Sequence, residues 1–188
     1  MTTDNMTAIL KETLTEKRFK HSMGVMETAA KLAKIHGADV EKATIAGLLH
    51  DCAKNYPAQD MIALCAEYGI ELDPVMKKAT GLIHGLLGAE LAKRKFGIDD
   101  DEIYDAIYYH TVGKPNMSLL TKIIYIADGI EPMRNFDGVD EIRKLAEVDL
   151  DRALVVQIDY TIKSVLGKGR LLHTNTVDTR NYYLEKIG

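Results

Sequence analysis

The chain has 188 residues, of which 46% are hydrophobic, and a formal net charge of -4 at pH 7. This length and composition are typical of one globular domain with a sizeable core, so we expect a single domain over residues 1–188. The slightly acidic balance provides no extended basic surface, and we therefore expect neither nucleic acid nor an anionic membrane as a partner.

The two cysteines, Cys52 and Cys65, are too few for the disulfide framework of a small secreted domain. The first residues lack a basic region followed by an apolar run, and no stretch of about 18 uninterrupted apolar residues occurs. We therefore expect a cytoplasmic protein without a membrane-spanning segment.

Helical periodicity dominates the chain and no alternating strand pattern is convincing, which predicts an all-α fold. Thr15 can cap the first clear helix, which carries His21 on its apolar stripe. Asp39 can cap the next helix, which is expected to continue into His50 and Asp51. Both helices thus bring polar side chains into apolar surroundings.

The middle of the chain shows helix start signals at regular intervals. Further helices are predicted from Pro57 to near Gly69, from Asp73-Pro74 onward, over Thr80–Phe96 with His84, from about Asp100 to His110, and from Ser118 through Asp128.

The last part of the chain is also predicted to be mostly helical. A turn is expected at Phe136–Gly138, then helices to Val148 and over Asp149–Leu166, an extended stretch at Leu171–Thr176, and a closing helix at Val177–Ile187.

The pair His50-Asp51 closes the apolar run Ile45–Leu49. Taken alone, such a pair is most simply an exposed helix end. However, four of the six histidines lie on separate predicted helices in apolar company, and Asp128 adds a carboxylate. Buried polar groups are costly unless they share partners, so we predict one metal site. Its candidate ligands are His21, His50, Asp51, His84, His110 and Asp128.

Three glycines, Gly81, Gly85 and Gly88, surround His84 within a predicted helix. Each should cost about 1 kcal/mol relative to alanine, so something requires a close approach at this point. The sequence leaves open whether a ligand or a neighbouring helix makes that approach.

The ordered set H…HD…H…H…D resembles the HD-domain metal-dependent phosphohydrolases. The flanks RFKHSMGV, LLHDCAKN, GLIHG, YHTVG, YIADGIEPMR and LLHTNTVDTRNYY resemble the YqeK-like symmetrical dinucleoside tetraphosphatases. The resemblance implies a single-domain HD-domain helical fold, with residues 171–188 as a nucleotide-contacting segment. It also implies hydrolysis of diadenosine tetraphosphate to two ADP, and a homodimer is plausible by the same resemblance.

The resemblance further implies that His21, His50, Asp51 and Asp128 hold a divalent transition metal, with Asp51 central to catalysis. Iron is the first expectation, while manganese, cobalt and zinc suit the same ligand types. Such an ion lowers the pKa of bound water and neutralises phosphate charge. His84 and His110 could complete a second metal site or contact phosphate.

Several residues are candidates for substrate contact. Lys54 matches the HDxxK pattern and could steady charge on phosphate, and the Lys17–Lys20 region is mainly a solvated face in which Arg18 could meet substrate. The remaining candidates by resemblance are Thr111, Arg134, Leu171, Leu172, His173, Thr174, Asn175 and Thr176.

Two other functions compete with this interpretation. An HD-type nucleotidase acting on mono- or triphosphates would use the same metal chemistry, because a fold does not select a substrate. A nucleotide-sensing module without turnover would not need a full ligand set beside Lys54.

Overall fold

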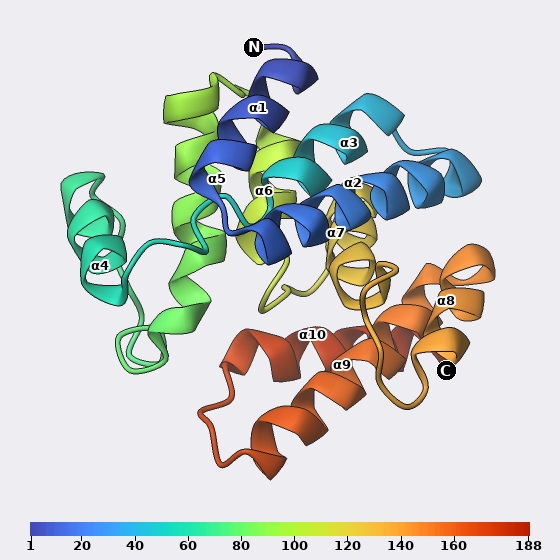
Figure 1. Cartoon of the computed structure of the whole chain (residues 1–188). Coiled ribbons are helices and arrows are strands. Elements are labelled where there is room, and N and C mark those ends of the chain that lie inside the picture. The colour runs from blue at the N-terminus through green and yellow to red at the C-terminus, as the bar shows by residue number, and fades with distance from the viewer.

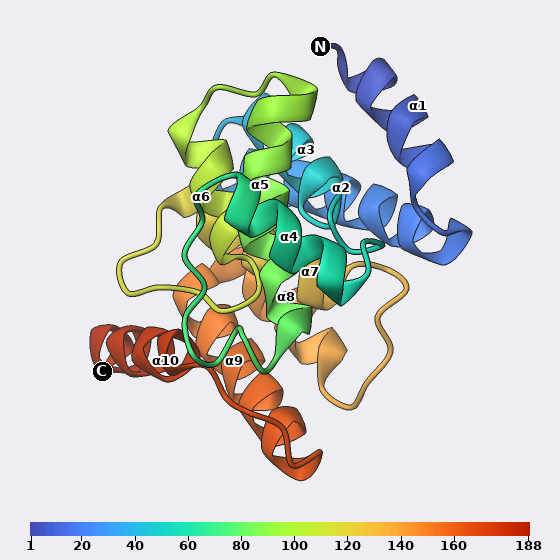
Figure 2. The same cartoon turned by 90° about the vertical axis from the view of Figure 1, so that its left-hand side faces the viewer.

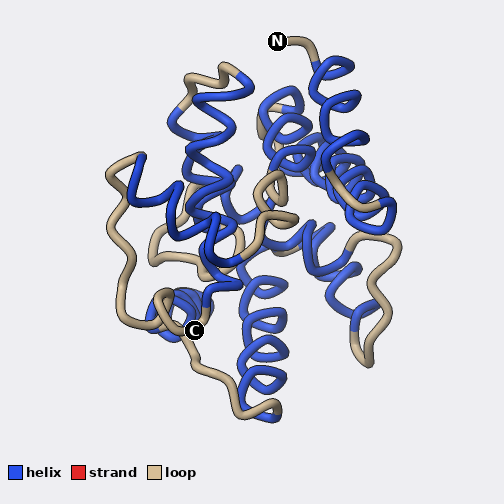
Figure 3. The backbone as a smooth tube through the Cα atoms, turned by 60° about the vertical axis from the view of Figure 1, so that its left-hand side comes forward, coloured by secondary structure: helices blue, strands red, loops and turns tan.

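The computed structural model describes residues 1–188 and consists of helices joined by loops, without a strand (Figures 1 and 3). The predicted all-α fold is therefore confirmed. The elements, in chain order, are α1 (Thr3–Thr13), α2 (Glu16–His36), α3 (Val40–Leu49), α4 (Ala58–Glu67), the 3-10 turn η1 (Thr80–Leu82), α5 (Ile83–Phe96), α6 (Asp101–Tyr109), α7 (Leu119–Ile130), α8 (Val139–Val148), α9 (Leu150–Gly167) and α10 (Thr174–Ile187).

Helix α7 lies at the centre of the molecule. It packs on α2, α3 and α6 and also on α8 and α9, and its buried residues belong to one continuous core. Figure 2 shows α9 and α10 below this bundle, with α4 in front of it. None of the helices is long and apolar enough to cross a membrane.

The predicted caps explain where most helices begin. In each case a side-chain oxygen of the cap accepts a hydrogen bond from a backbone N–H in the first turn, which has no partner within the helix. This geometry is present at Thr15, Asp39, Asp100, Ser118 and Asp149.

The prediction that α3 continues through His50 and Asp51 is wrong. The helix ends at Leu49, and the chain then turns tightly, with Cys52 N donating to Leu49 O. The His50 Nδ1 atom lies 2.7 Å from Gly47 O and donates to it. In a longer helix, the same carbonyl oxygen would accept the backbone N–H of Asp51, so the histidine ring competes with continuation of the helix. Asp51 therefore leaves the helix and projects from a turn.

Three other boundaries differ from the prediction. Asp73 accepts hydrogen bonds from Val75 N and Met76 N, but this start signal leads only to a turn. Helix α10 begins at Thr174 instead of Val177, because His173 acts as its cap, a role that histidine seldom takes. Helix α1, capped by Thr2, was not predicted.

Helix packing explains two of the three glycines around His84. A Cβ atom at Gly85 would lie 2.9 Å from Tyr108 O of α6, and one at Gly88 would lie 3.4 Å from Ile107 Cγ2. A Cβ atom at Gly81 would meet nothing within 4 Å. The close approach is thus between α5 and α6, which brings His84 near the end of α6.

We predict that Gly85→Ala destabilises the protein, whereas Gly81→Ala, the matched control, does not. Forcing a methyl group against a backbone carbonyl should lower the free energy of unfolding by about 1–3 kcal/mol. The control should change it by no more than about 0.5 kcal/mol. Urea unfolding of both variants measures the difference, and equal effects would show that α5 and α6 can separate freely.

Candidate metal centre

Six predicted ligands from five separate parts of the bundle meet at one point. All are buried except Asp128, which is half-buried. They are His21 of α2, His50 and Asp51 after α3, His84 of α5, His110 after α6, and Asp128 of α7.

The four imidazole rings share one orientation, in which Nδ1 faces the backbone or a carboxylate. The Nδ1 atoms of His50, His84 and His110 lie 2.6–2.7 Å from the carbonyl oxygen three residues earlier in the chain. A carbonyl oxygen can only accept, so each Nδ1 donates, and in the neutral ring Nε2 keeps its lone pair. The Nε2 atoms all face the cluster, where they can act as metal ligands.

The first ligand group consists of His21, His50, Asp51 and Asp128. His21 Nε2 lies 3.2 Å from His50 Nε2 and 3.0 Å from Asp128 Oδ1. Asp51 Oδ2 lies 3.6 Å from His21 Nε2 and 3.5 Å from His50 Nε2. The ligand atoms of His21, His50 and Asp51 lie within 4.8 Å of one another, and Asp128 adjoins them through its contact with His21. Two nitrogen and two oxygen donors suit a divalent transition metal.

The second ligand group consists of Asp51, His84 and His110. Asp51 turns its other oxygen toward it, with Oδ1 3.2 Å from His84 Nε2 and 3.9 Å from His110 Nε2. This oxygen is fully buried and has no hydrogen-bond partner. Because a buried carboxylate oxygen without a partner is costly, the group also fits a cation or a proton donor from a ligand.

The charges of the residues at the centre favour the binding of a cation. Burial opposes ionisation of Asp128, but the hydrogen bond with His21 and the charges of His50 and Arg134 lower its pKa. For Asp51, contacts with His50 and His84 outweigh burial and hold the pKa well below the usual range. Burial and the neighbouring His84 and His50 lower the pKa of His110 to about 3, so that ring stays neutral.

Sequence reasoning missed Glu131, which lies just behind the first ligand group. Its side chain is 1% exposed, and Oε1 lies 3.0 Å from His21 Nδ1. The carboxylate can only accept, so His21 Nδ1 donates to it and Nε2 faces the cluster. Gly24 leaves room for the Glu131 side chain, since a Cβ atom at position 24 would lie 2.8 Å from Glu131 Oε2. The available signal was an acidic residue ending the apolar run of α7.

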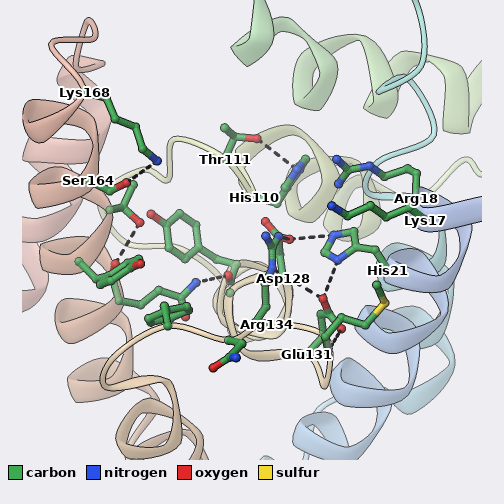
Figure 4. A pocket seen from close by; sticks show the side chains of 18 residues that line it. Lys17, Arg18, His21, His110, Thr111, Asp128, Glu131, Arg134, Ser164 and Lys168 are labelled. Atoms are coloured by element: carbon green, nitrogen blue, oxygen red, sulfur yellow. Dashed lines mark hydrogen bonds and ion pairs between the residues drawn. The ribbon is translucent and has the colours of Figure 1, made fainter. Parts of the chain in front are cut away.

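Four other predicted residues lie at the rim of the centre. Arg18 Nη1 donates to Asp51 Oδ2 at 2.5 Å, and Arg134 Nη2 donates to Asp128 Oδ1 at 2.5 Å. Lys54 Nζ lies 3.2 Å from His84 Nε2, and burial lowers the pKa of Lys54. Thr111 Oγ1 lies 3.1 Å from His110 Nε2. Figure 4 shows Arg18, Arg134 and Thr111 around one pocket with His21 and Asp128.

The predicted segment Leu171–Thr176 lies beside the centre and does not line this pocket. Thr176 Oγ1 donates to Val112 O and Asn175 Nδ2 to Gly113 O, so the segment supports the loop that follows Thr111. His173 is buried and its Nε2 lies 2.8 Å from Asp73 Oδ2.

Comparison with known proteins identifies the class. Residues 18–133 match the HD domain. A Bacillus subtilis protein named bis(5'-nucleosyl)-tetraphosphatase, symmetrical, is 43% identical over 97% of both chains, and a Halalkalibacterium halodurans protein of the same name is 41% identical over 94% of both. A crystal structure from Clostridium acetobutylicum is also similar, and it is described as a predicted HD superfamily hydrolase involved in NAD metabolism. Its sequence is 52% identical to this chain, and the two structures match with a TM-score of 0.96 over 99% of this chain and 98% of that one. The chain belongs to the HD-domain family.

We predict that Glu131→Gln weakens metal binding by about 10-fold, the lower end of the usual effect of altering the partner of a ligating histidine, because the amide still accepts from His21 Nδ1 but has no negative charge. Competition with a chelator, using manganese, measures the affinity. Glu147→Gln on the exposed side of α8 is the matched control and should bind metal like the parent. Equal affinity of all three proteins would mean that the negative charge of Glu131 makes no contribution to metal binding through His21.

Proposed function

We propose that this protein is a metal-dependent hydrolase that cleaves diadenosine tetraphosphate symmetrically into two molecules of ADP. The observation that carries the proposal is the buried Asp51 carboxylate, whose two oxygens face two groups of imidazole Nε2 atoms. The names of the relatives that match nearly the whole chain support the choice of substrate.

In this proposal the first ligand group, His21, His50, Asp51 and Asp128, holds one divalent ion. Iron is the first candidate, and manganese, cobalt and zinc suit the same donors. When bound, the ion lowers the pKa of a coordinated water to near neutrality and neutralises phosphate charge.

The surrounding cations hold the phosphate chain in position. Arg18 and Arg134 each pair with a ligand carboxylate, and a planar guanidinium has further donors for phosphate oxygens. Lys54 and the Thr111 hydroxyl lie on the His84 side of the centre and are placed to donate to phosphate there. Positioned donors of this kind stabilise charge that develops during phosphoryl transfer.

His84 and His110 have two candidate roles, as ligands of a second ion or as direct phosphate contacts. Only Asp51 Oδ1 and the two imidazoles face that position, so a second ion would have few protein ligands. We therefore propose that the first ligand group holds its ion tightly and that His84 and His110 contact phosphate when no second ion is bound.

The segment Leu171, Leu172, His173, Thr174, Asn175 and Thr176 is proposed to contact one nucleoside of the substrate. Its hydrogen bonds to Val112 and Gly113 support this proposal, because they hold the segment near the Thr111 hydroxyl that we propose as a phosphate contact. The same contacts make the segment a support for that loop.

The alternatives differ in observable ways. A nucleotidase for mono- or triphosphates would prefer substrates with one nucleoside, whereas a sensing module would bind nucleotides without turnover. The complete ligand set beside Lys54 argues against simple binding, since binding alone requires no group for activating water.

We predict that diadenosine tetraphosphate yields ADP as the only nucleotide product. In water enriched in heavy oxygen, one solvent oxygen should enter one of the two ADP molecules, because water attacks an inner phosphorus and the other ADP leaves. Chromatography with mass analysis measures both points, and Asp51→Asn should reduce turnover to background. ATP plus AMP as main products would contradict symmetrical cleavage.

A further inference from the structure

The metal centre occupies only one end of a much larger pocket. The pocket has a volume of about 630 Å³ and lies between α2, the end of α6, α7 and α9. Its other end is lined by one face of α9, on which Gln157, Tyr160, Thr161, Ser164 and Lys168 recur at helical spacing. Figure 4 shows Ser164 and Lys168 across the pocket from His21 and Arg18.

An aromatic pair forms part of this far end. The rings of Phe136 and Tyr160 are stacked, with centroids 4.0 Å apart and an angle of 24° between their planes. Tyr160 is 39% exposed although both residues line the pocket. Arg143 of α8 donates to the carbonyl oxygens of Glu131 and Arg134, which fixes the loop that carries Phe136. The pair therefore offers a fixed apolar surface beside polar groups.

A buried amide supplies an unused hydrogen-bond acceptor at the same end. Gln157 is 6% exposed, and its Nε2 donates to Tyr125 O at 2.7 Å, but its Oε1 has no partner. Gly129 leaves room for this amide, because a Cβ atom at position 129 would lie 2.1 Å from Gln157 Nε2 and would require the amide to move. Because Gln157 Oε1 is shielded from solvent, a ligand can donate an N–H or O–H to it only after the amide turns toward the pocket.

The charges of the pocket suit a polyphosphate chain. Lys17 and Arg18 lie on the α2 side, and Lys168 lies on the α9 side, where its Nζ donates to the neutral Ser164 Oγ at 2.9 Å. A polyanion can thus extend from the metal centre toward α9 without meeting a carboxylate from that helix among the lining residues.

We infer that the α9 end of the pocket binds the second nucleoside of the dinucleotide, with its base against the Phe136–Tyr160 pair. This inference rests on the proposed function. Symmetrical cleavage leaves two phosphates on each side of the broken bond, so the two nucleosides lie equally far from the centre and require two binding places. Leu171–Thr176 is proposed for one nucleoside and does not line this pocket. The α9 end supplies the other place.

The test measures binding of a diadenosine tetraphosphate analogue whose central bridging oxygen is replaced by methylene. In calorimetry with the manganese-loaded protein, Tyr160→Ala should bind the analogue about tenfold more weakly, as expected for loss of one base–aromatic stack. Tyr160→Phe keeps the ring and should bind like the parent. Inorganic tetraphosphate, which has no nucleoside, should bind equally well to all three proteins.

Tyr182→Ala is the matched control, because Tyr182 is similarly exposed but lies on α10, outside the pocket. Unchanged affinity of Tyr160→Ala for the analogue, or equal weakening for the analogue and tetraphosphate, would overturn this subsite. Because binding and not turnover is measured, failure of the parent to hydrolyse diadenosine tetraphosphate would count against the proposed function alone.

Discussion

The structure of this protein depends on imidazole Nε2 atoms that lie close together, while the protons of the same rings are on Nδ1 and are donated to other groups. His21 Nδ1 donates to Glu131 and His50 Nδ1 donates to Gly47 O, yet their Nε2 atoms lie only 3.2 Å apart. Two lone pairs at this distance repel unless positive charge lies between them. Burial opposes protonation of His50, but the nearby Asp51 and Asp128 carboxylates raise its pKa, so the surroundings favour positive charge. A divalent ion meets this need.

Bringing these ligand atoms together requires an interruption of the regular helical structure at the end of α3. Helix α3 stops where the His50 ring takes a backbone carbonyl, and this places Asp51 on a turn with its two oxygens toward different imidazoles. The central helix α7 carries Asp128 and is followed directly by Glu131, so one helix and its C-cap supply both a ligand and the carboxylate that orients His21. The pocket then extends from this centre to α9, where the exposed Tyr160 ring lies.

Much of this could be predicted from the sequence, because helix caps and apolar periodicity are local signals. Polar residues such as His21, His84 and Asp128 within apolar stripes pointed to the shared centre for the same reason. The role of Glu131 and the α9 end of the pocket depend on contacts between distant helices, which no local pattern encodes. The role of His173 as the cap of α10 also escaped prediction, since a histidine cap is rare and its partner Asp73 is far away in sequence.

The most direct test of this account is anomalous diffraction from crystals grown with manganese. We predict a strong peak within the first ligand group, among His21, His50, Asp51 and Asp128, with a weaker peak or none between Asp51 Oδ1 and the His84 and His110 rings. A dominant peak in the second group, or no ordered ion at the centre, would contradict it.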